Sequence, residues 1–128
     1  MKKTVLFVIL DNYSDREYPL LADALQFGIE DKKSQYEVKT LSATKQAVRS
    51  IGGFTTIPDY CLEDVPSDYE GVVLIGGYSW GTDEARQFVP FVEEAYKITF
   101  QNRRFGTKIL LWQTVRLALN LQKKFYLH

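Results

Sequence analysis

The sequence of 128 residues has little of the covalent and metal chemistry that side chains supply, with one cysteine, Cys61, and one histidine, His128. A single cysteine excludes an intramolecular disulfide and a metal site built from several thiolates, and it fits a reducing compartment. Because His128 is the last residue of the sequence, we expect it to fray and not to pair with a cysteine. We therefore expect neither a metal ion nor a cofactor.

Long apolar runs are also missing. The run at residues 4–10 has only seven residues and stops at Asp11, without the small-residue cleavage site of a signal peptide. A transmembrane helix needs about 20 apolar residues. These features predict a cytoplasmic protein that does not associate with membranes.

Acidic residues are absent from the last part of the sequence. Residues 1–94 hold nine basic and all sixteen acidic residues, so nine minus sixteen gives a net charge of −7, while residues 95–128 hold seven basic residues and a charge of +7. The whole chain is neutral, which does not favour general binding to nucleic acid.

The hydrophobic pattern predicts alternating strands and helices. Buried strands are expected at 4–10 and 71–75, and a strand nearer an edge at 36–41. A helix is expected between the strands at 4–10 and 36–41, with Pro19 in its first turn and Asp15 and Glu17 near its positive end. Its apolar face consists of Leu20, Leu21, Ala24, Leu25 and Ile29. A strand, a helix and a second strand in this order form a parallel crossover.

The later elements follow the same logic. Residues 45–58 predict a hairpin that turns at 51–53, and Asp83 opens a helix that Pro90 kinks or splits. A short strand at 106–112 and a basic helix at 114–125 complete the prediction. The fold class is α/β: a three-layer α/β/α sandwich with a flavodoxin-like, mostly parallel sheet, in a single domain over 1–128.

Gly76 and Gly77 end the strand at 71–75 and leave backbone N–H groups uncovered. Ligands of open α/β sheets collect at such carboxyl ends of strands. The alternative is a turn without chemistry. Flavodoxins share this fold class, but the loop at 11–15 has no glycine and its acidic residues would repel a phosphate. Phosphoacceptor domains share it too, and Asp11 could bind magnesium there, but no Asp follows the relevant central strand and the required lysine setting is missing.

Three motifs in order resemble the DJ-1/PfpI family of the class I glutamine amidotransferase-like superfamily, over residues 3 to about 97. They are the first strand leading into 11–17, Ser50-Ile51-Gly52-Gly53-Phe54 followed by Pro58-Asp59, and Leu74-Ile75-Gly76-Gly77 with Trp80. The resemblance implies that 1–97 is family-like, that 98–128 is a divergent basic tail, and that C-terminal elements of the family fold are missing. We expect that the tail after Lys97 arises from a frameshift or a truncation.

The resemblance also implies a site. Glu17 matches the glutamate that hydrogen-bonds a cysteine nucleophile, for which it must be at least partly protonated, and burial would favour that state. Gly76 and Gly77 match the glycines whose amides form an oxyanion hole. Without the resemblance, Glu17 is better interpreted as a carboxylate placed by the helix dipole.

The family's nucleophilic cysteine has no counterpart. Its turn would fall at Trp112, Gln113 and Thr114, of which only Thr114 could attack, and only with a base beside it. Cys61 has acidic neighbours that disfavour a thiolate, so we interpret it as structural and partly buried.

The sequence therefore predicts a DJ-1/PfpI-like protein, related to proteases and amidases, that is inactive because its nucleophile is absent. The alternative is a non-catalytic module that forms a homodimer or holds a small-molecule or peptide ligand at the strand ends. Nucleic-acid binding by the basic tail is a remote third hypothesis, based on the mixture of basic and aromatic residues after Lys97.

Overall fold

Five parallel strands form the main sheet of the computed structural model, which describes residues 2–30, 32–101 and 110–111. The strand order in this described part is β5-β2-β1-β6-β7. The strands are β1 (Lys3–Val8), β2 (Tyr36–Ser42), β5 (Tyr60–Cys61), β6 (Gly71–Leu74) and β7 (Leu110–Leu111). Because β1 lies in the centre and pairs with both β2 and β6, its apolar residues are shielded on both faces, as the continuous apolar run predicts.

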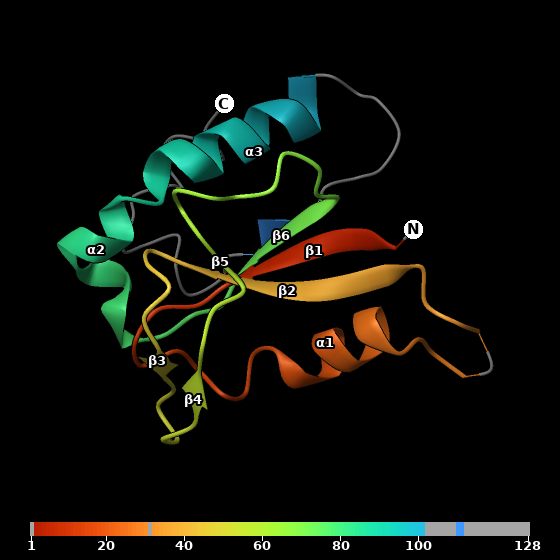
Figure 1. The fold of residues 1–128 in the computed structure, drawn as a ribbon, viewed down its shortest axis with the longest axis horizontal. Helices are drawn as coiled ribbons and strands as arrows, with labels where there is room; N and C mark the ends of the chain where they lie inside the picture. The colour runs from red at the N-terminus through yellow and green to blue at the C-terminus, as the bar shows by residue number, and fades with distance from the viewer. Residues whose placement is uncertain (1, 31, 102–109, 112–128) are drawn as a thin grey trace.

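Helices cover both faces of this sheet (Figure 1). On one side lies α1 (Pro19–Gln26), and on the other lies α3 (Val89–Gln101), which follows the short helix α2 (Asp83–Arg86). A single 3-10 turn, η1 (Tyr78–Gly81), links β6 to α2. The three-layer α/β/α arrangement with a mostly parallel sheet is confirmed.

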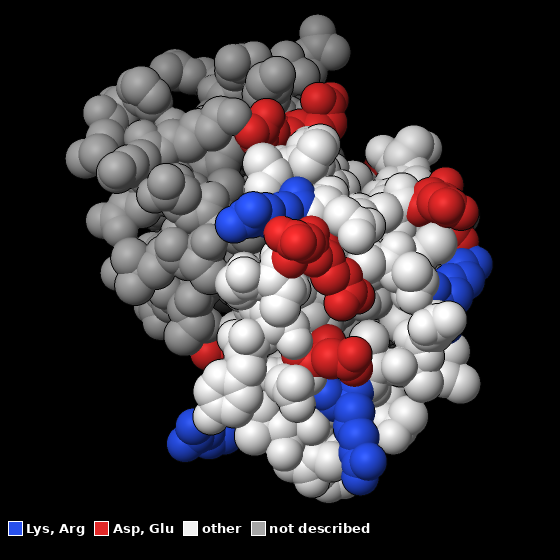
Figure 2. All heavy atoms as spheres, turned by 90° about the vertical axis from the view of Figure 1, so that its left-hand side faces the viewer, with Lys and Arg blue, Asp and Glu red and all other residues white. Residues whose placement is uncertain are grey.

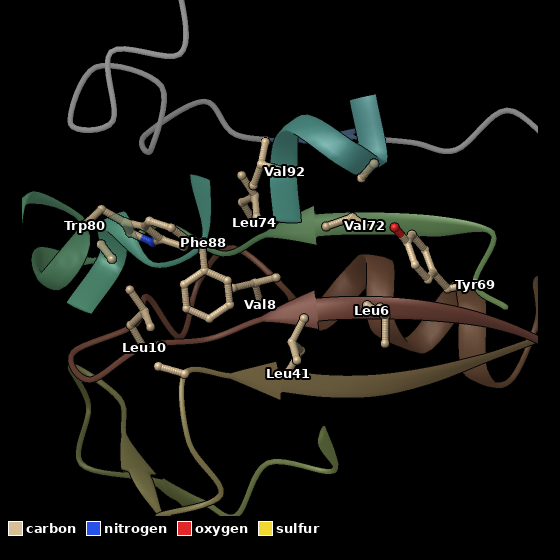
Figure 3. Packing of buried hydrophobic residues seen from close by; sticks show 13 residues of the cluster. Leu6, Val8, Leu10, Leu41, Tyr69, Val72, Leu74, Trp80, Phe88 and Val92 are labelled. Atoms are coloured by element: carbon tan, nitrogen blue, oxygen red, sulfur yellow. The ribbon is translucent and has the colours of Figure 1, made fainter. Parts of the chain in front are cut away.

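Each face of the sheet has its own apolar core. Leu6, Val8, Val72 and Leu74 pack against Phe88 and Val92 on the side of α2 and α3 (Figure 3). Phe7, Val73 and Ile75 face the α1 side, where helix residues such as Leu21 and Leu25 are only partly buried. This second core is the thinner of the two, since α1 has no fully buried residue.

An antiparallel ribbon lies beside the main sheet. Its arms, β3 (Val48–Arg49) and β4 (Thr55–Thr56), pair Val48 with Thr56 and Arg49 with Thr55. This confirms the hairpin predicted for residues 45–58. The split at Pro90 is also confirmed: α2 ends before it, and Pro90 is the second residue of α3, where a missing N–H costs nothing.

The first helix begins at Pro19 with Tyr18 as its N-cap, so Asp15 and Glu17 precede it on the side of its positive end. The apolar face expected for this helix is wrong in part. Leu20 and Ile29, assigned to the apolar face, are 88% and 65% exposed. The physical reason is that the chain from Asp11 to Glu17 is held elsewhere, by contacts described below, and the helix starts only after them.

The strand β5 lies between the hairpin and β6, where the sequence analysis names no strand, and its two residues pair with Leu41 and Ser42 of β2. Of the strand expected at 106–112, the described part is β7, which lies parallel beside β6. Trp112, Gln113, Thr114 and the basic helix expected at 114–125 lie outside the described residues. Among the helices that the structure describes, none has the length and apolarity to cross a bilayer.

Candidate functional site

The carboxyl end of β6 is held by a side chain from the loop after β1. The Gly76 N–H donates to Oε2 of Glu17 at 2.5 Å, a bond between residues 59 positions apart. Gly76 is buried, whereas Glu17 is exposed as a residue. The structure thus brings together two of the residues that the sequence analysis places in the site, but without the burial of Glu17 that the sequence analysis considered.

The backbone of the same loop pairs with the turn after β6. Ser14 N–H donates to the Gly76 carbonyl at 2.7 Å, and Tyr78 N–H donates to the Asn12 carbonyl at 3.2 Å. Tyr13 and Gly77 therefore face each other as an isolated antiparallel bridge. Asn12 accommodates the turn with φ of 59°, a left-handed conformation that asparagine adopts more readily than most residues.

Gly77 is required here by close approach. A Cβ on Gly77 would lie 2.3 Å from the Asn12 carbonyl oxygen and 2.8 Å from the Tyr13 Cα, both backbone atoms. Its φ of 168° is extended and suits any residue, so space and not conformation demands glycine. A residue between two antiparallel bonds directs its own N–H away from the partner. No acceptor within the described ranges pairs with the Gly77 N–H, and Gly77 is half-buried.

On its other side the loop is bonded to the ribbon. Arg49 N–H donates to the Asp11 carboxylate at 3.1 Å, and Asn12 N–H donates to the Arg49 carbonyl at 2.6 Å. Ile51 N–H donates to the Tyr13 carbonyl at 2.9 Å, and Gly52 N–H donates to the Asp15 carboxylate at 2.7 Å. The Ser50 hydroxyl and the Gly52 amide lower the pKa of Asp15, so this carboxyl stays ionised. The loop is thus fixed between the ribbon and the end of β6.

Trp80 anchors the segment that follows Gly77. Its indole Nε1–H donates to the Ile75 carbonyl at 2.6 Å, and its ring lies 5.9 Å from that of Phe88. The Ser79 hydroxyl donates to the Asp11 carbonyl at 2.6 Å. Because Trp80 is buried and bonded to the last residue before the glycine pair, it fixes the direction in which the chain leaves β6. The sequence analysis named Trp80 only as part of a motif. A large aromatic residue three positions after two glycines is the sequence feature that could have indicated its anchoring role.

Cys61 lies far from this site. It ends β5, and three strand spacings of about 4.8 Å separate β5 from β6, or about 14 Å in all. The cysteine is buried, and its N–H donates to Oδ1 of Asp64 at 2.7 Å. Asp64 is ion-paired with Lys45, whose ammonium group, with the Cys61 amide, lowers the pKa of Asp64 to about 2. These contacts give Cys61 a structural environment.

Charge does not single out a ligand at this end of the molecule. Figure 2 views the side that carries α2 and the ribbon, and acidic and basic side chains are interspersed over its described part. Residues 2–30, 32–101 and 110–111 contain no group of three or more carboxylate, cysteine or histidine side chains that could hold a metal ion. What the site offers is a carboxylate bonded to Gly76 N–H and, on the next residue, a backbone N–H that is directed away from the loop.

Comparisons with known proteins agree on one family. The family model described as "DJ-1/PfpI family" matches residues 3–103. A Bacillus subtilis (strain 168) protein named "Uncharacterized protease YdeA" is 38% identical over 95 residues, which cover 74% of this chain and 45% of that protein. The chain therefore spans about half the length of this curated relative.

Solved structures show the same fold. The crystal structure of a ThiJ/PfpI family protein from Bacillus anthracis matches with a TM-score of 0.67 and 24% identity, covering 77% of this chain and 48% of that one. The structure of Drosophila melanogaster DJ-1beta matches with a TM-score of 0.65 and 18% identity, covering 94% and 61% respectively.

Proposed function

The chain belongs to the DJ-1/PfpI family, and from this we propose that the end of β6 binds an amide group, of a peptide or of a small molecule, without cleaving it. The observation that carries the proposal is the bond from Gly76 N–H to Glu17, which fixes a carboxylate at the residue before Gly77, whose own N–H is directed away from the loop. The name of the Bacillus subtilis relative, a protease, supports an amide as the bound group.

The two glycines have different roles in this proposal. Gly76 gives its N–H to Glu17 and so positions the carboxylate. Gly77 N–H is the donor that meets the ligand, as an oxyanion-hole amide would. A carboxylate has about four acceptor positions, so Glu17 can accept from a ligand N–H in addition to Gly76.

This pairing of a donor with an acceptor selects a neutral amide. A carbonyl oxygen of the ligand accepts from Gly77 N–H, and an N–H elsewhere on the same ligand donates to Glu17. A ligand carboxylate would accept from Gly77 equally well, but the negative charge of Glu17, held at the preceding residue, would repel it. We therefore expect amides to bind in preference to the corresponding acids.

Turnover is not part of the proposal, because the proposal assigns no cysteine to the end of β6. Cys61, the single cysteine of the sequence, is buried on β5, about 14 Å away across the sheet. The segment at Trp112, Gln113 and Thr114, where the family's cysteine is expected, contains no thiol.

The test combines an activity assay with a binding assay. We expect the chain to release no more product from fluorogenic peptide amides than its Cys61→Ser variant does. N-acetylalanine amide should shift the backbone NMR signals of Gly76 and Gly77, N-acetylalanine should do so less, and Glu17→Ala should weaken both responses while Arg16→Ala leaves them unchanged. Hydrolysis that depends on Cys61, or equal binding by Glu17→Ala, would contradict the proposal.

A dimerising module is the second candidate, favoured by apolar side chains that lie in solvent. Leu20 and Phe27 at the two ends of α1, with Phe54 and Ile57 on the ribbon, are 69% to 88% exposed. Exposed apolar patches of this kind mark interaction surfaces. Sedimentation equilibrium should show a dimer that the Phe27→Ser variant weakens. A monomer at every concentration would exclude this candidate. The expected cytoplasmic location stays a prediction.

A further inference from the structure

A hollow of about 170 Å³ lies between α1, the ribbon and the face of the sheet that α1 covers. Its floor comes from β1 and β2, one side from α1 and the other from β4, with contributions from Phe7, Val38, Ala22, Tyr13, Tyr18 and Thr56. The hollow exists because α1 has no fully buried residue and therefore leaves space above the sheet. Glu17, Gly76 and Gly77 are not among its lining residues.

Two tyrosines give the hollow an aromatic wall. The rings of Tyr13 and Tyr18 have their centroids 6.0 Å apart, with planes inclined by 58°. The Tyr13 hydroxyl is bonded to the Thr56 hydroxyl at 2.8 Å, which fixes the Tyr13 ring. For the Tyr18 hydroxyl, no hydrogen-bond partner occurs in the part of the chain that the structure describes.

The charged groups around the hollow restrict the charge of the ligand that it can bind. Burial, and after it Tyr13 and the Asp15 carboxylate, raise the pKa of Tyr18, so its hydroxyl keeps its proton and can donate. The Asp59 carboxylate lies beside the hollow too, where it accepts from the lining residue Thr40 at 3.1 Å. Two carboxylates near a largely apolar wall disfavour an anion, and desolvation disfavours any charged ligand.

We propose that this hollow is a binding site for a small neutral phenol, whose ring packs against Tyr13 and Tyr18 and whose hydroxyl bonds to the Tyr18 hydroxyl. The size agrees, since an apolar cavity of about 150 Å³ is enough to hold benzene. A ring contact with aromatic side chains adds to the gain from burial. The phenol oxygen accepts from the hydroxyl of Tyr18, which has no hydrogen-bond partner among the described residues. The proposal does not depend on amide binding at β6.

The probe for this site is 4-methylphenol, titrated into the isotope-labelled full chain and followed by backbone NMR. We expect saturable shifts at Ala22, Val38 and Thr56 and none at Gly81, which is remote from the hollow. Toluene should bind more weakly than 4-methylphenol, and benzoate should not bind.

Two variants test the assignment. Ala22→Leu places a larger side chain in the hollow and should weaken binding by about tenfold or more, whereas Ala24→Leu, the same change on α1 at a position that does not line the hollow, should have no effect. Tyr18→Phe removes only the hydroxyl, so it should weaken the binding of 4-methylphenol by about three- to tenfold and leave the binding of toluene unchanged.

Three results would overturn the proposal. They are an absence of saturable shifts up to the solubility limit of the probe, equal binding by the Ala22→Leu and Ala24→Leu variants, and a dimer that Ala22→Leu dissociates while the phenol does not bind. The last would mean that a second copy of the chain fills the hollow. If Ala22→Leu does not fold, the proposal is tested by Tyr18→Phe alone, which must weaken the binding of 4-methylphenol and leave the binding of toluene unchanged.

Discussion

The backbone N–H of Gly76 donates to the carboxylate of Glu17 at 2.5 Å and thereby joins the end of β6 to the loop that follows β1. Neither residue is part of a helix or strand. Together with the Ser79 hydroxyl bond to the Asp11 carbonyl, this bond adds side-chain contacts to the backbone bonds between the two turns. It is where the proposed amide site begins.

Loss of this bond should destabilise the protein measurably. We expect Glu17→Ala to lower the free energy of unfolding in urea by about 1–2 kcal/mol, because a part-buried N–H loses a charged acceptor. Glu17→Gln keeps a carbonyl oxygen at the same place and should cost less than Glu17→Ala. The neighbouring exposed Arg16→Ala is the control and should have almost no effect. Equal stability of the alanine variant and the native protein would show that the bond contributes nothing.

The close approach at Gly77 predicts a sharp contrast between two glycines. Gly77→Ala should destabilise by about 3 kcal/mol, since its Cβ would meet backbone atoms of Asn12 and Tyr13 that cannot move aside cheaply. Gly81→Ala, four residues further on, finds nothing within 4 Å and should leave stability nearly unchanged. Thermal unfolding of both variants measures the difference. Similar melting temperatures would mean that the loop can move away from Gly77.

The ion pair of Lys45 and Asp64 should make stability depend on pH under acid conditions. The pKa of Asp64 is lowered from 3.8 to about 2, chiefly by Lys45, so the folded state favours the ionised form. Its contribution is present above pH 3.8 and is lost as the pH falls toward 2. The urea midpoint of Asp64→Asn should accordingly decline less between these values than that of the native protein. Asp68→Asn, at an exposed position, should follow the native curve.

Cys61 should react slowly with iodoacetamide in the native protein, because its side chain is buried in β5. In urea the same thiol should be alkylated at the rate of a small-molecule thiol. Mass spectrometry of samples quenched over time gives both rates. Fast labelling under native conditions would show that β5 opens readily or that the thiol is exposed.

The central strands are predictable from sequence because their signal is strong and local. Residues 4–10 and 71–75 are continuous apolar runs, and both become strands whose residues are buried on two faces. The hairpin at the ribbon is predictable for the same reason, since its glycines mark the turn between β-forming residues. By contrast β5 has only two residues and is defined by its partner β2, so no local pattern could indicate it.

Leu20 shows where helical spacing is insufficient. It lies at the interval expected of an apolar face but is 88% exposed, because the position at which the helix begins, and hence its rotation, depends on how the preceding loop is fixed. The pairing of Glu17 with Gly76 also cannot follow from spacing, since the residues are 59 positions apart. The family resemblance suggested that both residues belong to one site, and the geometry adds that the Gly76 N–H is already bonded.

The loop at 11–17 bonds on one side to residues 49–52 and on the other to residues 76–79, with partners separated in sequence by 37 to 68 positions. Contacts of such high sequence separation require the intervening chain to be ordered first, because closing long loops costs entropy before any contact repays it. We expect this corner of the molecule to close no earlier than β1 and β6 pair, since those strands are themselves as far apart in the sequence. During native-state hydrogen exchange, the amides of Gly76 and Tyr78 should open before those of β1, so the proposed site can loosen while the sheet beneath it stays intact.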